Sequence, residues 1–352
     1  MQAFATNQQI PAGSVASEKV MRIFVIGAAG AIGKCLTEVL LKNGMEVVAA
    51  LRKTPLPEAL TRMPGLFQEF GVECTDEASI RSCFEKYPGI DCCWNLAAPL
   101  SVETAGNPDL AYDVVVNGMD RLLKVMRDYN VPHICFSDSI GSYGGEAPRN
   151  SNAAWLVANP TQDPGSAYGE QKRKCRELMR DFVAEQPNRR SCRWAVIPGV
   201  LHSDVTWGAG TTEYALDALR CASEGTTFVC PIEEDILLPM IWRDDLIEGL
   251  CLLTMAPTNA LKEPDGGYAM AGLSFTPLEL FAEITKRIET FQFSTEKDTE
   301  KLLKESPAAL FARLWVDHLT PEEAERDLGF RAKDIELGAI IDRILEGWNT
   351  RK

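Results

Sequence analysis

Near its start the chain reads Ile23-Phe24-Val25-Ile26, continued without a break by Gly27-Ala28-Ala29-Gly30-Ala31-Ile32-Gly33. The four apolar residues predict a short buried strand, and apolar positions at helical spacing from Ile32 onward predict a helix. Glycines at this turn would let the backbone approach a pyrophosphate, while the helix N-terminus supplies N–H donors and positive potential. In this strand–turn–helix context the G-x-x-G-x-x-G spacing predicts dinucleotide binding, with contacts from Gly27, Gly30, Ala31, Ile32 and Gly33.

Downstream of this unit, short apolar runs keep alternating with helical patterns. Such alternation predicts βαβ units, and therefore an α/β fold of the Rossmann type with a doubly wound parallel sheet. The further strands are expected at 47–51, within 66–74, and at 92–98, 134–137 and 195–197. The clearest later helices are expected at 110–129 and 168–185.

The alternation weakens after about residue 200, which predicts a division of the chain. We expect a disordered tail over residues 1–20 and a dinucleotide-binding Rossmann domain over 21–200. Residues 201–352 would then form mainly a smaller C-terminal substrate-binding lobe. The chain is expected to return to the Rossmann sheet near 236–250.

The composition narrows the class of partner. Of the 352 residues, 45% are apolar and 24% charged, and the net charge is −14. A chain this acidic is repelled by phosphate backbones and anionic membrane surfaces, so neither a nucleic acid nor a membrane is expected as a partner. A small-molecule substrate is the remaining expectation.

The cysteines and histidines point to a reducing compartment without a metal site. The eleven cysteines include no C-x-x-C pair, which favours buried free thiols over a disulfide framework. The three histidines, His133, His202 and His318, have no metal-ligand spacing, so no metal is expected. The first twenty residues lack the apolar core of a signal peptide, so the predicted location is the cytoplasm.

The end of the second strand indicates which nicotinamide cofactor is used. An acidic residue there would bind the ribose hydroxyls of NAD(H), but Leu51 occupies that place. Arg52 and Lys53 follow, and their cationic groups suit a 2′-phosphate. We therefore favour NADP(H) and leave NAD(H) open. Glu73, after the third strand, is a further candidate cofactor contact, through the adenine amino group.

A candidate acid–base group lies in the second half of the Rossmann domain. Tyr168 and Lys172 form a Y-x-x-x-K motif at the start of a predicted helix, one turn apart on the same face. A nearby ammonium favours the phenolate form of a tyrosine, which makes it a better base. Ser139 follows the 134–137 strand, and the carboxyl ends of strands are where ligands bind in open α/β sheets.

Together these motifs resemble the extended short-chain dehydrogenase/reductase superfamily. The glycine turn, Asn95-Leu96-Ala97-Ala98, the serine four residues before Tyr143-Gly144, and Y-x-x-x-K carry the resemblance. It implies that Ser139 holds the substrate oxygen, that Tyr168 moves the proton, and that Lys172 tunes the tyrosine and holds the nicotinamide ribose. It also implies cofactor contacts from Leu96, Ala97, Ala98, Tyr168 and Lys172.

Within this superfamily the chain resembles the short-chain-type L-threonine 3-dehydrogenases, from about residue 21 to 348. The resemblance rests on Ile197-Pro198-Gly199-Val200, Gly210-Thr211-Thr212-Glu213-Tyr214-Ala215, Leu238-Pro239-Met240-Ile241 and Ser274-Phe275-Thr276-Pro277. It implies that Ser101, Ser139, Thr211 and Thr212 bind an amino-acid substrate. Thr211 or Thr212 would equally well cap the helix that follows.

Several positions depart from the pattern of that family. Leu51 replaces the acid of the second strand, Glu213 replaces an aspartate, Val115 takes the place of a helix asparagine, and Val196 takes that of an arginine. We therefore expect an NAD(P)-dependent oxidation of the secondary alcohol of a β-hydroxy-α-amino acid, not necessarily threonine. An NADPH-dependent carbonyl reductase and a sugar-nucleotide epimerase or dehydratase are the alternatives. The resemblance further implies a homodimer, paired through the helices at 110–129 and 168–185.

Overall fold

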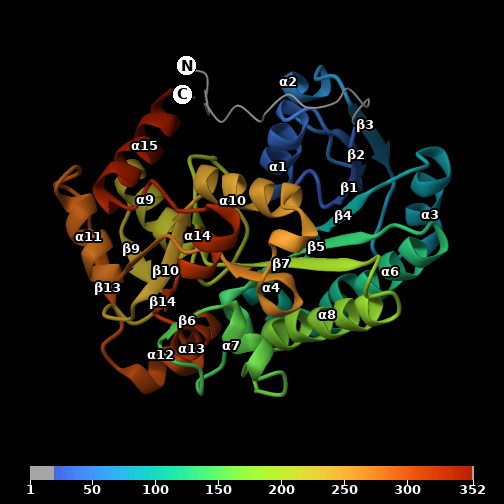
Figure 1. Cartoon of the computed structure of the whole chain (residues 1–352). Coiled ribbons are helices and arrows are strands. Elements are labelled where there is room, and N and C mark those ends of the chain that lie inside the picture. The colour runs from blue at the N-terminus through green and yellow to red at the C-terminus, as the bar shows by residue number, and fades with distance from the viewer. Residues whose placement is uncertain (1–19, 351–352) are drawn as a thin grey trace.

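The computed structural model describes residues 20–350, apart from the side chain of Pro264. Except for Val20, the tail predicted at residues 1–20 lies outside the described residues. The described residues form a layered α/β domain, with most of the later, yellow to red elements gathered in a smaller lobe beside it (Figure 1).

The centre of the larger domain is a seven-stranded sheet in which every paired strand runs parallel to its neighbours. Its order is β11-β7-β5-β4-β1-β2-β3, so the chain begins in the middle and winds toward each edge in turn. This confirms the predicted Rossmann-type doubly wound fold. The strands are β1 (Arg22–Ile26), β2 (Glu46–Leu51), β3 (Leu66–Phe70), β4 (Cys92–Asn95), β5 (His133–Ser139), β7 (Ser191–Ile197) and β11 (Gly267–Ala269).

Helices cover both faces of this sheet because successive strand residues point to opposite sides. In β1, Phe24 and Ile26 belong to one core cluster, while Ile23 and Val25 belong to another. The first cluster holds α3 (Glu77–Lys86), α6 (Gly118–Asp128) and α8 (Ala167–Ala184). The second holds α1 (Ala31–Lys42), α2 (Glu58–Thr61) and α10 (Arg243–Met255).

The helix predicted at 110–129 is interrupted. It consists of α5 (Pro108–Tyr112), a π-helical turn at Asp113–Asn117, and α6. The turn contains three consecutive valines, whose branched side chains crowd a regular α-helix. The shorter α4 (Ser101–Gly106) precedes it and begins at one of the predicted substrate residues.

The smaller lobe is built from short pairings. A three-stranded sheet has the order β12-β10-β8, and β13 pairs with β9 and β14 with β6. These strands are β6 (Asn150–Ser151), β8 (Gly199–Leu201), β9 (Phe228–Cys230), β10 (Leu238–Trp242), β12 (Leu273–Phe275), β13 (Phe293–Thr295) and β14 (His318–Leu319). The remaining α-helices are α7 (Ala153–Ala158), α9 (Tyr214–Glu224), α11 (Pro277–Thr285), α12 (Thr299–Glu305), α13 (Pro307–Leu314), α14 (Glu322–Leu328) and α15 (Leu337–Asn349).

The return of the chain to the Rossmann sheet differs from the prediction. The strand near 236–250 is β10, and it pairs with β8 and β12, so it lies outside the seven-stranded sheet. Pro198 separates β7 from β8 and has no N–H for the ladder, so the chain leaves the large sheet there and β10 follows β8. Only α10 returns to the large domain at this point, and β11 joins the sheet later, beside β7.

Across residues 20–350, no helix combines the length and apolarity needed to cross a membrane. The same residues contain no group of three or more histidine, cysteine or acidic side chains placed to hold a metal ion. The eleven cysteines all lie in this part of the chain and are free, and only Cys35 and Cys221 are not buried.

Candidate active site

The glycine turn lies between β1 and α1, tightly packed on the neighbouring strand end. Gly27 has φ +85°, and a Cβ there would lie 2.9 Å from the backbone N of Ala97. A Cβ on Gly33 would lie 2.2 Å from the carbonyl oxygen of Gly27. Gly30 is the N-cap of α1 and offers no side-chain cap, so the first N–H groups of the helix stay available to a ligand. This is a cradle that added side chains would fill, and it fits a pyrophosphate.

A large cleft opens over this turn, about 1480 Å³ in volume and continuous with solvent. Most of the predicted cofactor contacts line it, namely Gly27, Gly30, Arg52, Glu73, Leu96, Ala97 and Ala98. Lys53 is exposed and does not line the cleft, and Ala31 and Gly33 are set in the first turn of α1 instead. The cleft is therefore formed by the carboxyl ends of the central strands, where a dinucleotide is expected.

The end of β2 has no acid directed at this cleft. Leu51 is 1% exposed and contributes only an apolar side chain to the wall of the cleft, whereas Arg52 is exposed and lines the cleft with Glu73. The guanidinium of Arg52 can meet a phosphate, and Leu51 cannot bind ribose hydroxyls.

A second cleft, about 710 Å³ in volume, adjoins the first and shares Leu96, Ala98 and Pro99 with it. It brings together all of the predicted catalytic and substrate residues, together with Ile32 of the glycine turn. These residues are Ser101, Ser139, Tyr168, Lys172, Thr211 and Thr212. A dinucleotide that spans the shared wall would reach from its phosphate cradle into this catalytic pocket.

Lys172 is buried at the base of the catalytic pocket. It is 2% exposed, and its Nζ donates a hydrogen bond of 2.7 Å to the carbonyl oxygen of Ser137. The same Nζ lies 5.4 Å from the centre of the Tyr168 ring. The hydrogen bond fixes the ammonium of Lys172 beside the Tyr168 ring.

Ser139 and Tyr168 are brought together by two glycines. A Cβ on Gly141 would lie 2.7 Å from the Tyr168 ring, so the ring rests directly on this backbone. A Cβ on Gly169 would lie 2.0 Å from the carbonyl oxygen of Gly141. The Gly141 N–H in turn donates to Ser139 Oγ over 3.1 Å. The carboxyl end of β5 and the start of α8 are thus pressed together, with Ser139 and Tyr168 on the pocket side.

The other wall carries Ser101, Thr211 and Thr212. Ser101 Oγ accepts a hydrogen bond from the Thr211 N–H over 3.2 Å and lies 3.1 Å from Thr211 Oγ1. Both residues are buried, so this pairing joins α4 to the loop before α9. Neither threonine caps α9, whose N-cap is Glu213.

Glu213 and Trp315 also line the catalytic pocket, although the sequence did not identify them as site residues. Burial raises the pKa of the Glu213 carboxyl to about 7. Its Oε2 lies where a side chain on Gly210 would begin, 2.2 Å from that position, and it accepts a hydrogen bond from Thr212. For Glu213, the one indication in the sequence was that it replaces an aspartate of the family pattern. Nothing in the sequence around Trp315 indicated a site.

The helix asparagine that the family pattern expects has no counterpart in the pocket. Val115 is buried in the core, and the exposed Asn117 bonds instead to Asp113 within the π-helical turn. Val196 is likewise fully buried in β7.

The chain is similar to known proteins over most of its length. Residues 23–193 match the NAD dependent epimerase/dehydratase family. The chain is 27% identical to an uncharacterized epimerase/dehydratase of Staphylococcus haemolyticus over 92% of its own length and 96% of the relative. It is also 27% identical to the mitochondrial L-threonine 3-dehydrogenase of Sus scrofa, over 72% of its own length and 63% of that protein.

Among solved structures, a partial consensus L-threonine 3-dehydrogenase superposes with a TM-score of 0.78. The two are 26% identical, and the match covers 93% of this chain and 99% of the other. The predicted NAD(P)-dependent enzyme of the dehydrogenase/epimerase kind is thereby confirmed. The match of residues 23–193 to the NAD dependent epimerase/dehydratase family agrees with the predicted resemblance to the extended short-chain dehydrogenases/reductases.

Proposed function

We propose that this protein oxidises the secondary alcohol of a β-hydroxy-α-amino acid, as an L-threonine 3-dehydrogenase does, with NADP(H) favoured over NAD(H). The observation that carries the proposal is a single pocket. It joins the acid–base set Ser139, Tyr168 and Lys172 to a wall with the buried carboxylate of Glu213. The acid–base set can take the proton of an alcohol, and the carboxylate of Glu213 can bind an ammonium group.

The acid–base set acts on the alcohol end of the substrate. Ser139 Oγ accepts from the Gly141 N–H, so its own proton can be donated to the substrate oxygen. Tyr168 takes the proton of the substrate hydroxyl as the carbonyl forms. Lys172, fixed on the Ser137 carbonyl, stabilises the resulting negative charge on the tyrosine. A nicotinamide dinucleotide, when bound, accepts the hydride that leaves the same carbon.

The other wall acts on the amino-acid end. Glu213 can accept hydrogen bonds from the substrate ammonium once its carboxyl is ionised. Thr212 and the Ser101–Thr211 pair supply hydroxyl groups near the same wall for the substrate carboxylate. For L-threonine the product would be 2-amino-3-ketobutyrate.

The preference for NADP(H) rests on the end of β2. Arg52 lines the cofactor cleft, and Leu51, which stands where an acid would bind the ribose hydroxyls, is buried. The same observation favours a second candidate function, the NADPH-dependent reduction of a different small carbonyl compound in the same pocket.

The test is a cofactor-reduction assay on purified protein. L-Threonine, L-serine and other β-hydroxy amino acids are each offered with NAD⁺ and with NADP⁺. We expect turnover of at least one amino acid, a preference for NADP⁺, and a loss of more than about 100-fold in kcat for Tyr168→Phe, because general acid–base catalysis is worth that much. Tyr129→Phe, at a partly exposed surface position, is the matched control and should leave kcat unchanged.

Three results would count against the proposal. Full activity of Tyr168→Phe would remove the assignment of the base. Silence on every amino acid, with reduction of other carbonyls by NADPH, would establish the reductase. Copurified NAD together with binding of a nucleotide sugar would establish the epimerase or dehydratase.

We further propose the cytoplasm as the location of the enzyme. The free state of all eleven cysteines supports a reducing compartment. Labelling of the native and denatured protein with a thiol reagent, after isolation under alkylating conditions, should reveal eleven reduced thiols, and a recovered disulfide would contradict the proposal.

A further inference from the structure

Asp138, the residue before Ser139, carries a buried carboxylate with three donors around it. It is 1% exposed. Its Oδ1 accepts from the N–H of Ser139 over 2.8 Å and from Ser142 Oγ over 2.5 Å. Its Oδ2 accepts from the guanidinium of Arg176. A carboxylate in such a place is stable only while these donors, and above all the positive charge, are present.

Arg176 comes from the helix that also carries Tyr168 and Lys172. It lies one turn beyond Lys172 on α8, and besides Asp138 it donates to Ser142 Oγ over 2.8 Å. Its guanidinium carbon is 5.3 Å from the centre of the Trp194 ring, and its side chain is only 11% exposed. The ion pair therefore joins the turn after β5 directly to α8.

We propose that Asp138 and Arg176 are positioning residues that set the distance between Ser139 and the Tyr168–Lys172 pair. Ser139 stands on the β5 side of the pocket, and the other two stand on α8. The inference rests on the proposed function for what these three residues do. Arg176 lines neither the cofactor cleft nor the catalytic pocket, whereas Asp138 lines the catalytic pocket beside Ser139.

The neighbouring arginines of α8 do not make this connection. Arg173 bonds to Glu170 and Glu177 of its own helix and to the carbonyl of Pro160. Arg180 is exposed and makes no hydrogen bond or ion pair with another described residue. Among the three, only Arg176 bonds to the β5 end, so Arg180 is a matched control on the same helix.

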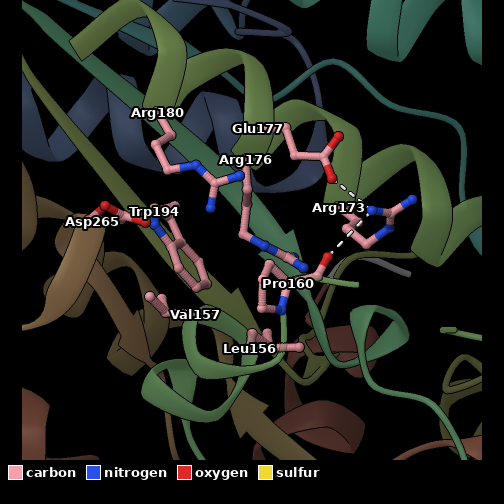
Figure 2. Close-up of a pocket in the computed structure, with 9 residues that line it drawn as sticks. All are labelled: Leu156, Val157, Pro160, Arg173, Arg176, Glu177, Arg180, Trp194 and Asp265. Carbon is pink, nitrogen blue, oxygen red and sulfur yellow. Dashed lines mark hydrogen bonds and ion pairs between the residues drawn. The ribbon is translucent and has the colours of Figure 1, made fainter. Parts of the chain in front are cut away.

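Arg176 also faces a pocket that is separate from the two clefts. It lines a pocket of about 320 Å³ together with Arg180, Trp194 and Leu156, and Figure 2 shows its side chain running from α8 between Trp194 and Arg173. If Arg176 is shortened to alanine, free guanidinium can enter from this pocket and take the place of the missing group against Asp138. Chemical rescue thus separates the role of the positive charge from general damage to the helix.

The kinetic experiment compares Arg176→Ala, Arg176→Lys and Arg180→Ala, with whichever substrate the wild type turns over. We expect Arg176→Ala to lose about 10- to 100-fold in kcat, the worth of one charge-assisted hydrogen bond, with the KM for cofactor nearly unchanged. Millimolar guanidinium should restore much of this loss, while urea or sodium at equal concentration should not. Arg176→Lys should be intermediate, because lysine keeps the positive charge but has a shorter reach and lacks the planar guanidinium that packs against the Trp194 ring. Arg180→Ala should match the wild type.

A second measurement requires no substrate. Amide hydrogen exchange is followed by mass spectrometry, and Arg176→Ala should speed exchange in the segment 137–143 while leaving the glycine turn at 27–33 unchanged. Should Arg176→Ala not fold, Arg176→Lys and Asp138→Asn are compared in the same way.

Unchanged exchange at 137–143, a wild-type kcat for Arg176→Ala, or loss of kcat without rescue by guanidinium would overturn the positioning role. Absence of turnover in the wild type would instead overturn the proposed function, and the exchange result would still decide the role of the pair.

Discussion

Glu213 gives the catalytic pocket a group that ionises close to neutral pH. Burial raises its pKa to about 7, so the carboxyl is mostly neutral below that value and charged above it. Only the charged form attracts a substrate ammonium, so we expect kcat/KM for a β-hydroxy amino acid to rise as the pH rises through about 7. The neutral Glu213→Gln should lose this step and about 10- to 100-fold in kcat/KM at pH 8.

The matched control for that measurement is Glu224→Gln, at the exposed C-terminal end of the same helix, α9. It should keep the wild-type pH profile. A pH step that survives in Glu213→Gln would assign the ionisation to another group.

The predicted and the missed site residues differ in a simple respect. The positions of three site residues could be predicted from sequence spacing, because one helix turn or one strand end fixes where their side chains point. These residues are Ser139, Tyr168 and Lys172. Trp315 reaches the catalytic pocket from the C-terminal end of α13, more than 100 residues along the chain from Thr211 and Thr212. No local sequence pattern therefore predicts it. The pairing of Asp138 with Arg176 likewise depends on how β5 and α8 pack.

Gly33 shows how an element depends on one missing side chain. Its neighbourhood is helical, where alanine would ordinarily be favoured by about 1 kcal/mol. A Cβ there would nevertheless lie 2.2 Å from the Gly27 carbonyl oxygen. We therefore expect Gly33→Ala to push α1 away from the glycine turn and to weaken dinucleotide binding by about 10-fold or more, measured by quenching of protein fluorescence.

Gly106→Ala provides the comparison, because this glycine of α4 has open space where its Cβ would be. It should bind the dinucleotide as the wild type does. Equal binding by Gly33→Ala would show that the turn is loose enough to accept a side chain and would contradict the close packing.

At the level of elements, the periodic sequence patterns predicted most strands of the large sheet and the helices that cover it. They did not predict strands that are very short or that pair with a strand distant in the sequence. β11 has three residues and begins at Gly267, where a Cβ would lie 2.3 Å from the Trp194 ring. Its place beside β7 comes from this packing and from the bond of Trp194 Nε1 to the carbonyl of Asp265, and three residues carry no readable alternation.

The predicted pairing of two copies through α6 and α8 stays a prediction. The apolar stripe of each helix packs into the large core, which leaves charged outer faces such as that of Lys124 and Arg173. Any contact made there would be electrostatic, and so weakened by salt.

The two lobes of the molecule meet at the segment after β8, and His202 makes that junction sensitive to acid. The neighbouring Asp204 bonds to Lys34 of α1 and Arg243 of α10, and its carbonyl accepts from Trp348 Nε1 of α15. His202 is 4% exposed, and its Nδ1 accepts the Asp204 N–H over 3.2 Å, which a protonated Nδ1 cannot do. Burial, with the charge of Arg243 in addition, lowers the pKa of His202 to about 4.

The sign of the effect on stability follows from proton uptake. Between the ordinary histidine value of 6.5 and about 4, the unfolded chain binds this proton and the folded protein does not. The stability contributed by neutral His202 is therefore complete above pH 6.5 and is lost as the pH falls toward 4, by about 3 kcal/mol at most. Urea unfolding at pH 7 and pH 4.5 should show a smaller pH difference for His202→Asn, which keeps an acceptor but does not titrate, while exposed His318→Asn should behave as the wild type. Because Ser139 and Glu213 stand on opposite lobes, activity should fall over the same acid range. If the stability of His202→Asn toward urea depends on pH as strongly as that of the wild type, the acid sensitivity comes from another group.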